Sequence, residues 1–239
     1  MFTRTIAIGD IHGCSRALDG LIEEIKPTAS DRLIFLGDYV DRGPDSRGVI
    51  DRLLSLRKHC ETICLLGNHE ILFRSVLGGL PAEPWLGTGG QQTLLSYGGS
   101  LQGVPAEHLA FLYQLLPYYE TEKALFVHAN YDSRLPMAQQ TEEMLYWEHL
   151  GENPPLPHVS GKHVYLGHTP QANLEIGYFG HFTCVDTYCF GGGWLSGVDV
   201  ESGEVWQTSQ NGQSKKKGRI LELIWRKFQS LRAGATDGG

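Results

Sequence analysis

Three short apolar runs near the start of the chain each stop at a glycine followed by a polar residue that can bind a metal. The runs cover residues 5–8, 32–36 and 63–66, and they end at Gly9-Asp10, Gly37-Asp38 and Gly67-Asn68. Between them, apolar residues recur at helical spacing over 16–25 and 49–56. This alternation of strand and helix predicts a parallel βαβαβ unit with right-handed crossovers.

The polar residues after these strands are expected to lie close together, because ligands gather beyond the carboxyl ends of parallel strands. Two later runs end in the same way, residues 124–127 at His128 and residues 164–166 at Gly167-His168. The candidate metal ligands are therefore Asp10, His12, Asp38, Asn68, His128 and His168. They offer nitrogen and oxygen but no sulfur, which favours Mn²⁺, Fe²⁺ or Zn²⁺ over a structural Cys-type zinc site.

Such a ligand set is suited to hydrolysis of phosphate esters. One aspartate can bridge two ions, and two ions about 3.5–4 Å apart bind phosphoryl oxygens and generate hydroxide from water near neutral pH. His69 directly follows Asn68 and suits protonation of a leaving alkoxide. Asp41 is expected to orient that imidazole, and Arg42 offers a planar donor fork that matches phosphate.

The rest of the chain predicts one domain with an insert and a tail. Residues 71–122 are expected to be an insert that shapes the cleft, broken by prolines and by glycines around 87–90, with a helix near residues 109–116. The apolar runs at 182–185, 194–200 and 204–208 are expected to form later, antiparallel strands, with a hairpin turn at Ser202-Gly203. The predicted division is a domain over 1–210 and a basic amphipathic tail over 211–239.

Composition excludes some function classes. The net charge is −7, from 20 Lys and Arg against 27 Asp and Glu, which disfavours a nonspecific nucleic-acid binder. No apolar run reaches the ~18–20 residues of a membrane span, and no signal peptide precedes the first strand, so we expect a cytoplasmic protein without stable membrane insertion.

The tail is basic, with seven Lys and Arg and one Glu over residues 213–232. Its apolar residues Ile220, Ile224, Phe228 and Leu231 could line one face of a helix. That helix is expected either to pack on the domain or to touch a partner or a membrane surface.

Five blocks together resemble the signature of the calcineurin-like metallophosphoesterases. They are Gly9-Asp-Ile-His-Gly13, Gly37-Asp-Tyr-Val-Asp-Arg-Gly43, Gly67-Asn-His-Glu70, His128-Ala129 and Gly167-His-Thr169. More narrowly, they resemble the phosphoprotein phosphatase family of Ser/Thr phosphatases, in its small bacterial and bacteriophage-lambda type. The resemblance runs from about residue 5 to 208, and the segment from Trp85 to Gly98 is similar to the insert of bacterial members.

The resemblance implies an α/β (α+β) fold with a central β-sandwich of mixed sheets flanked by helices. It implies two divalent ions, which we expect to be manganese, with iron and zinc as alternatives. Asp10, His12 and Asp38 would hold the first ion, and Asp38, Asn68, His128 and His168 the second. His69 with Asp41 would be the general-acid pair, and Arg42 and Asn68 would bind the substrate phosphate.

Two positions depart from the family pattern. Family members commonly carry Arg before the Gly-Asn-His-Glu block, where this chain has Leu66. Many carry a second phosphate-binding Arg in a Trp-x-Arg segment, which here reads Trp147-Glu148-His149. We expect His149, or less readily Arg134, to take that role, with weaker or differently oriented phosphate binding.

The function expected from these residues is metal-dependent phosphomonoester hydrolysis, as a protein Ser/Thr phosphatase in which a metal-bridging hydroxide attacks phosphorus directly. The expected partner is a phosphoprotein or a small phosphate ester, and not a nucleic acid. The alternative is hydrolysis of dinucleoside polyphosphates such as diadenosine tetraphosphate. A catalytically dead scaffold is disfavoured, because such proteins usually lose ligands and none is missing here.

Overall fold

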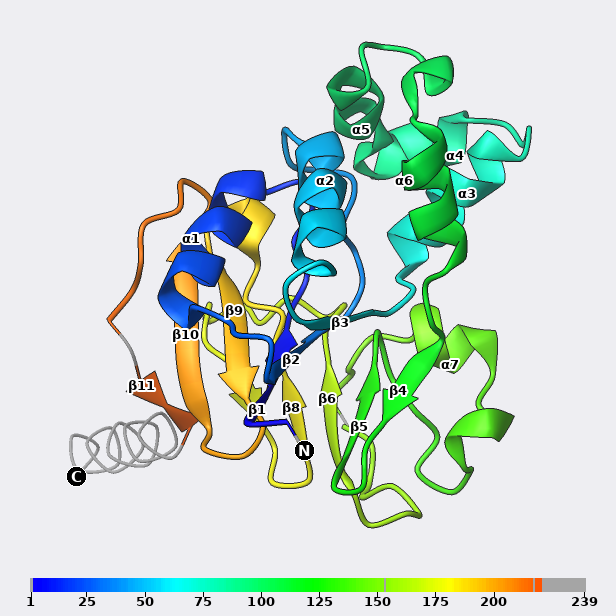
Figure 1. Ribbon diagram of the computed structural model, residues 1–239. Helices are drawn as coiled ribbons and strands as arrows, with labels where there is room; N and C mark the ends of the chain where they lie inside the picture. The colour runs from blue at the N-terminus through cyan, green and yellow to red at the C-terminus, as the bar shows by residue number, and fades with distance from the viewer. Residues whose placement is uncertain (1, 153, 217, 221–239) are drawn as a thin grey trace, which may run out of the picture.

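The predicted βαβαβ unit is confirmed in the computed structural model, which describes residues 2–152, 154–216 and 218–220 (Figure 1). The unit consists of β1 (Arg4–Ile8), α1 (Ser15–Ile25), β2 (Asp31–Phe35), α2 (Ser46–Leu56) and β3 (Glu61–Cys64). β1 pairs with β2, and β2 with β3, both in parallel, with Ile6 opposite Leu33 and Ile34 opposite Ile63. The three strands therefore end at one edge of the sheet.

Three later strands extend this sheet on the side of β1. They are β9 (Trp194–Asp199), β10 (Glu204–Ser209) and β11 (Gly218–Arg219), and the strand order is β11-β10-β9-β1-β2-β3. β9 and β10 are antiparallel, as predicted, and Gly203 closes their turn at a φ of 68°. β11 lies inside the range expected to be a separate tail, whereas the rest of the predicted tail helix, residues 221–239, lies outside the described residues.

The second sheet is mixed and has the order β4-β5-β6-β8-β7. Its strands are β4 (Tyr118–Glu120), β5 (Ala124–Val127), β6 (His163–Leu166), β7 (Gly177–Tyr178) and β8 (Phe182–Cys184). The expectation of an antiparallel strand at 182–185 is wrong with respect to β6, because Val164 lies opposite Phe182 in a parallel pair. The connection over 167–181 is long enough for the crossover that a parallel pair needs.

Alternation along the strands builds a core on each face of the first sheet. Ala7 and Ile34 face the second sheet, where they meet Phe126 and Tyr165 in one buried cluster. Ile6, Ile8, Leu33 and Phe35 belong to the larger cluster on the side of α1 and α2, the helices that cover the outer face in Figure 1. Full burial of such a side chain contributes about 1.5–3 kcal/mol, so this packing fixes where the strands end.

The predicted insert is mostly helical. It contains most of α3 (Asn68–Leu77), then α4 (Glu83–Trp85), the π-helical turn η1 (Leu86–Gly90), α5 (Gln91–Ser96), the 3₁₀ turn η2 (Leu101–Gly103) and α6 (Ala106–Tyr113). α3 begins three residues before the expected insert, where the Glu70 carboxylate accepts a hydrogen bond from Gly67 N at 3.2 Å. Pro84 lies in the first turn of α4, where proline is tolerated.

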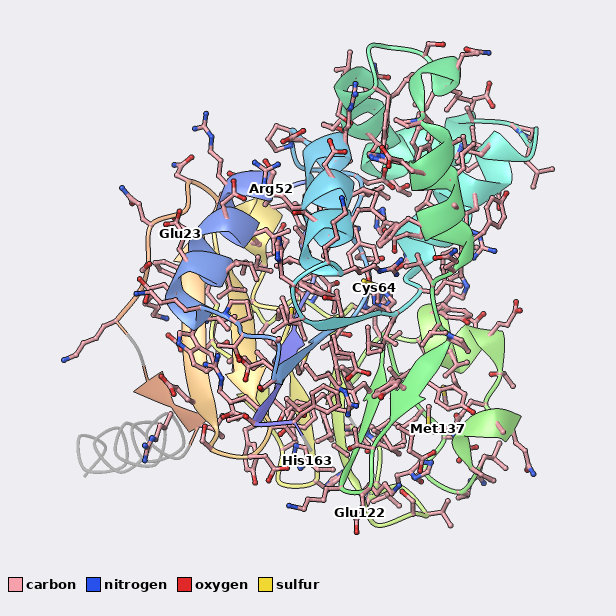
Figure 2. The ribbon with its side chains drawn as sticks, in the orientation of Figure 1. Glu23, Arg52, Cys64, Glu122, Met137 and His163 are labelled. Carbon is pink, nitrogen blue, oxygen red and sulfur yellow. The ribbon has the colours of Figure 1, made fainter. Side chains whose placement is uncertain are left out.

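Three short elements complete the described fold, η3 (Met137–Gln139), α7 (Glu142–Tyr146) and η4 (Cys189–Gly191). Figure 2 shows His163, the first residue of β6, near the lower edge of the molecule, and Cys64, the last residue of β3, near its centre. The carboxyl end of β3 is buried, with Cys64 2% exposed. Among the described residues, no helix combines the length and the apolar character needed to cross a bilayer.

Candidate metal centre

Side chains from five separate segments meet beyond the carboxyl ends of the strands, as the sequence predicts. Possible ligand atoms of His12, Asp38 and His69 lie within 4.8 Å of one another, and so do those of Asp38, His128 and His168. Asp38 belongs to both groups and is 2% exposed. The Asn68 amide lies 3.1 Å from His128 Nε2 and 3.1 Å from His168 Nδ1. Asp38 is thus placed to bridge two neighbouring positions.

The three candidate histidine ligands each present a lone pair to this centre. One ring nitrogen of each histidine is hydrogen-bonded to a backbone carbonyl oxygen. The distances are 3.0 Å from His12 Nδ1 to Val40 O, 2.8 Å from His128 Nδ1 to Leu36 O and 3.1 Å from His168 Nε2 to Trp147 O. A carbonyl can only accept, so that nitrogen carries the hydrogen and the other is left as an acceptor. Histidines that bind a metal through one ring nitrogen usually make such a hydrogen bond with the other.

The donor set and the local charge fit divalent cations. Within the described residues, five carboxyl groups gather here at 3% exposure or less, from Asp10, Asp38, Asp41, Glu70 and Asp186. Arg42 is the nearby guanidinium that acts on Asp10 and Asp186. Buried charges need partners, and the possible ligand atoms in each of the two groups around Asp38 lie within 4.8 Å of one another. Nitrogen and oxygen donors of this kind are suited to Mn²⁺, Fe²⁺ and Zn²⁺.

The three candidate histidine ligands differ from His69 in their pKa shifts. Burial lowers the pKa of His12 and of His168 to about 3 and also lowers that of His128, so these rings are neutral and able to bind a metal. Burial alone would raise the pKa of Asp38, but the four surrounding histidines lower it further than burial raises it. Asp38 is therefore a carboxylate.

His69 has the opposite balance. Burial opposes the charged ring, but the carboxylates of Asp38 and Asp41 outweigh it and raise the pKa of His69. His69 Nδ1 donates to Asp41 Oδ2 at 2.7 Å, which leaves Nε2 available for a proton. Asp41 also accepts from Trp85 Nε1 at 2.9 Å and from Thr93 Oγ1 at 2.7 Å. The insert therefore completes the surroundings of Asp41, a role that the sequence did not predict.

Backbone strain is concentrated in these loops. The φ angle is 47° at His12, 51° at Asp38, 71° at Asp41, 66° at Arg42 and 62° at His168. Each such residue costs about 1–3 kcal/mol and persists only where its surroundings hold it. Sparsely populated backbone conformations of this kind cluster at functional sites.

Glu70 is one of the groups that holds the strained loop, and sequence analysis assigned it no role. Its buried carboxylate accepts hydrogen bonds from three successive backbone N–H groups, those of Asp38 at 3.0 Å, Tyr39 at 2.8 Å and Val40 at 3.1 Å. Burial raises the pKa of Glu70, and the hydrogen bonds from the backbone of Val40 and Tyr39 oppose this rise. The sequence signal for this role was the position of Glu70 in the first turn of α3, just before an apolar run.

Two glycines show why each ligand follows a residue without a side chain. A Cβ on Gly67 would stand 2.2 Å from Asp38 Oδ1, and one on Gly167 would stand 2.1 Å from Asp10 Oδ1. No side chain fits at either position, so the backbone comes directly against the carboxylates.

Asp10 and Arg42 lie beside the two ligand groups. Asp10 is in neither group, and its carboxylate accepts from His168 N at 3.0 Å. Arg42 has its guanidinium carbon 4.6 Å from the centre of the Phe190 ring, and that ring packs edge-on against His12 at 4.8 Å. The Arg42 backbone is held by a hydrogen bond to Gly89 O at 3.0 Å.

The two positions that depart from the family pattern have different surroundings. Leu66 is buried in the hydrophobic core. His149 is exposed, and its ring stacks on that of His168 with 4.2 Å between the ring centres. Arg134 is exposed and paired with Asp132 at 2.7 Å. His149 and Arg134 line one groove of about 490 Å³, which also includes Glu148.

Comparison with known proteins shows which family has this fold and this arrangement of side chains. The sequence matches the calcineurin-like phosphoesterase family over residues 3–200. The chain belongs to this family, and the resemblance seen in the sequence is confirmed at that level.

Two curated relatives carry the same name, symmetrical bis(5'-nucleosyl)-tetraphosphatase. The protein of Cellvibrio japonicus is 44% identical over 77 residues, which are 32% of this chain and 28% of that protein. The protein of Pseudomonas putida strain GB-1 is 32% identical over 156 residues, 56% of this chain and 52% of that protein. The chain therefore matches about a quarter to a half of the length of these relatives.

A solved structure gives the same indication. A protein assigned as a diadenosine tetraphosphatase superposes with a TM-score of 0.63 at 25% identity, over 82% of this chain and 89% of that one. These comparisons overturn the main functional expectation from the sequence, the protein Ser/Thr phosphatase, in favour of the stated alternative. The five blocks contain the candidate metal ligands, which suit both activities. They therefore do not distinguish a phosphoester substrate from a phosphoanhydride substrate.

Proposed function

We propose that this chain hydrolyses bis(5'-nucleosyl) tetraphosphates symmetrically, by cleaving the central phosphoanhydride to give two nucleoside diphosphates. The observation that carries the proposal is the ring of acceptor groups around Asp38, together with the groove whose His149 stacks on His168. The names of the curated relatives support the same substrate class.

Two divalent ions are part of this proposal, with manganese as the expected metal and iron and zinc as alternatives. Asp10, His12 and Asp38 would hold one ion, and Asp38, Asn68, His128 and His168 the other. When bound, such ions neutralise phosphate charge and make a water molecule nucleophilic near neutral pH. The neutral rings of His12, His128 and His168 are already in the state that binding needs.

The side chains around this centre have distinct tasks. His69 is held by Asp41 in its protonated form and donates a proton toward the leaving phosphate. Arg42 offers its donor fork to a phosphate oxygen, and Phe190 limits where that fork can move. Asn68 and His149 are the further phosphate-binding residues, with His149 fixed by its stack on His168.

The groove beside His149 suits the nucleoside end of the substrate. The carboxylates of Glu148 and Glu152 line it and would repel a polyphosphate, whereas that of Asp132 is paired with Arg134. The same groups can accept hydrogen bonds from ribose hydroxyls and base amino groups. A long, two-ended substrate therefore has a place for its phosphates at the metal centre and for one nucleoside in the groove.

The test is a product assay with the full chain and Mn²⁺, with diadenosine tetraphosphate, a serine phosphopeptide and an aryl phosphate as substrates. We expect the tetraphosphate to have the highest kcat/KM and to give ADP as its one nucleotide product. Formation of ATP and AMP in equal amounts would contradict symmetrical cleavage. A preference for the phosphopeptide would contradict the proposal as a whole.

A further inference from the structure

Asp186 lies at the same sheet edge as the candidate ligands, although the sequence did not place it there. It follows β8, and β8 runs parallel to β6, so both strands deliver their carboxyl ends to one edge. Val185 N donates to Leu166 O at 2.7 Å, and Gln171 N donates to Asp186 O at 3.1 Å. On its other side, Asp186 N lies 3.3 Å from where a Cβ on Gly9 would stand. Asp186 is thus held between the loops that carry Asp10 and His168.

The carboxyl group of Asp186 is only half satisfied. Its side chain is buried, with the residue 2% exposed. Oδ1 accepts a hydrogen bond from Tyr188 N at 2.9 Å, whereas Oδ2 has no hydrogen-bond partner in the described part of the chain. A buried acceptor without a partner costs about 1–3 kcal/mol, and a charged one costs more. Such an atom in a packed interior indicates a missing partner.

The surroundings of this oxygen indicate a cation as that partner. Asp10, Asp38 and Asp186 are all buried at 3% exposure or less. The backbone ties their loops together, because His168 N donates to Asp10 Oδ2 at 3.0 Å and His12 N donates to Asp38 O at 2.8 Å. Three carboxyl groups that repel one another in a buried volume are stabilised together by a divalent ion.

We propose that Asp186 is a positioning residue of the metal centre, whose unpartnered Oδ2 strengthens binding of the divalent cation at Asp10, His12 and Asp38. The inference depends on the metal centre and not on the substrate. It adds a residue that lies outside the five sequence blocks.

A matched control is available in Asp199, at the end of β9. Its Oδ1 accepts from the backbone N of Glu201, two residues on, just as Asp186 accepts from Tyr188. Asp199 is also buried, but its Oδ2 accepts from Ser202 Oγ at 2.6 Å. Because β9 is antiparallel to β1, Asp199 lies at the opposite edge of the sheet from Asp10. Asp199 therefore makes the same kind of backbone contact as Asp186, but both of its carboxylate oxygens have hydrogen-bond partners.

The experiment titrates the metal-stripped full chain with Mn²⁺ in a calorimeter. The variants are Asp186→Asn, Asp186→Ser and Asp199→Asn. We expect both Asp186 variants to bind one of two Mn²⁺ ions about 10–100-fold more weakly, as is typical when an outer partner of a metal site is lost. The Asp199→Asn variant is expected to keep both affinities within about twofold of the wild type.

Thermal unfolding of the metal-free proteins separates this role from a purely structural one. Removal of an unpaired buried charge leaves the Tm of metal-free Asp186→Asn unchanged or raises it, whereas a structural role predicts a lower Tm. Mn²⁺ affinity within twofold of the wild type in the Asp186 variants would overturn the proposal. If Asp186→Asn does not fold, Asp186→Ser decides, since serine retains an acceptor for Tyr188 N. Neither readout uses the tetraphosphate, so failure of the proposed substrate leaves this test intact.

Discussion

At the scale of single residues, the site assigns different protonation states to chemically identical side chains. His12, His128, His168 and His69 are all buried, and burial favours the neutral ring in each case. At His69, the charge of Asp38 and the hydrogen bond and charge of Asp41 together outweigh burial and raise the pKa of the ring. In the proposed function, three of these rings would therefore bind metal and one would donate a proton.

The role of His69 predicts a dependence on the leaving group. We expect His69→Asn to lower hydrolysis of an alkyl phosphate by about 10²-fold or more, because the alkoxide needs a proton. The loss with the tetraphosphate should be smaller, since a nucleoside diphosphate is a weaker base. Steady-state kinetics on both substrates measures the difference, with the exposed His59→Asn as the control. An equal loss on both substrates would show that His69 does not protonate the leaving group.

The close approach at Gly67 predicts a steric effect. We expect Gly67→Ala to destabilise the protein by about 1–3 kcal/mol, because its Cβ would stand 2.2 Å from Asp38 Oδ1. Mn²⁺ affinity should fall in the same variant as Asp38 moves. Gly87→Ala is the control, since nothing lies within 4 Å of a Cβ there. Urea unfolding of both variants measures the difference, and equal stabilities would contradict this explanation.

At the scale of elements, the insert is hydrogen-bonded directly to the candidate site. Trp85 of α4 and Thr93 of α5 both donate to the buried Asp41 carboxylate. Thr93 Oγ1 also accepts from Asp41 N at 2.8 Å. The orientation of the His69–Asp41 pair therefore depends on helices that begin more than 40 residues after Asp41 in the chain.

Replacement of Thr93 tests this dependence. Thr93→Val keeps the shape and removes the hydroxyl, so a buried carboxylate loses a donor at a cost of about 1–3 kcal/mol. We expect kcat to fall together with stability in this variant. We also expect the pKa of the proposed general acid, His69, to shift in the pH–rate profile. Thr93→Ser keeps the hydroxyl and should retain the wild-type pH profile. Identical pH profiles for the two variants would contradict a link between the insert and Asp41.

Sequence reasoning located the residues that follow a clear strand pattern and missed those that depend on tertiary pairing. Asp38 and His168 were found because each follows an apolar run and a glycine. Asp186 was missed because β8 was expected to be antiparallel, which would place its end at the other edge of the sheet. Trp85 and Thr93 were seen only as part of an insert, since nothing local shows that they reach Asp41.

At the scale of the whole molecule, two packed sheets bring ligands together from both halves of the chain. β1 and β2 supply Asp10, His12 and Asp38, and β5 and β6 supply His128 and His168. The hydrophobic layer between the sheets, with Ala7 and Ile34 against Phe126 and Tyr165, sets the distance between these groups. Formation of the site therefore requires the complete fold.

The ion pair between Arg4 and Asp31 in the first sheet predicts how the free energy of unfolding changes at acid pH. Arg4 donates to both carboxylate oxygens of Asp31, at 3.1 and 2.7 Å, and this hydrogen bonding lowers the pKa of Asp31 to about 2. The stabilisation is complete above the unfolded pKa of about 4 and is lost as the pH falls toward about 2. We expect Asp31→Asn to lose about 1–3 kcal/mol at pH 7 and to have a shallower loss of stability between pH 4 and pH 2. Urea titrations across this range test it, and a parallel pH dependence in both proteins would contradict it.

The most direct test of the account is the location of metal in crystals of the full chain grown with Mn²⁺. Anomalous diffraction is expected to show two peaks, one beside Asp10, His12 and Asp38 and one beside Asn68, His128 and His168, with Asp38 touching both. Addition of a chelator should remove both peaks and abolish hydrolysis. An anomalous map without a peak at Asp38, from crystals of active protein, would contradict it.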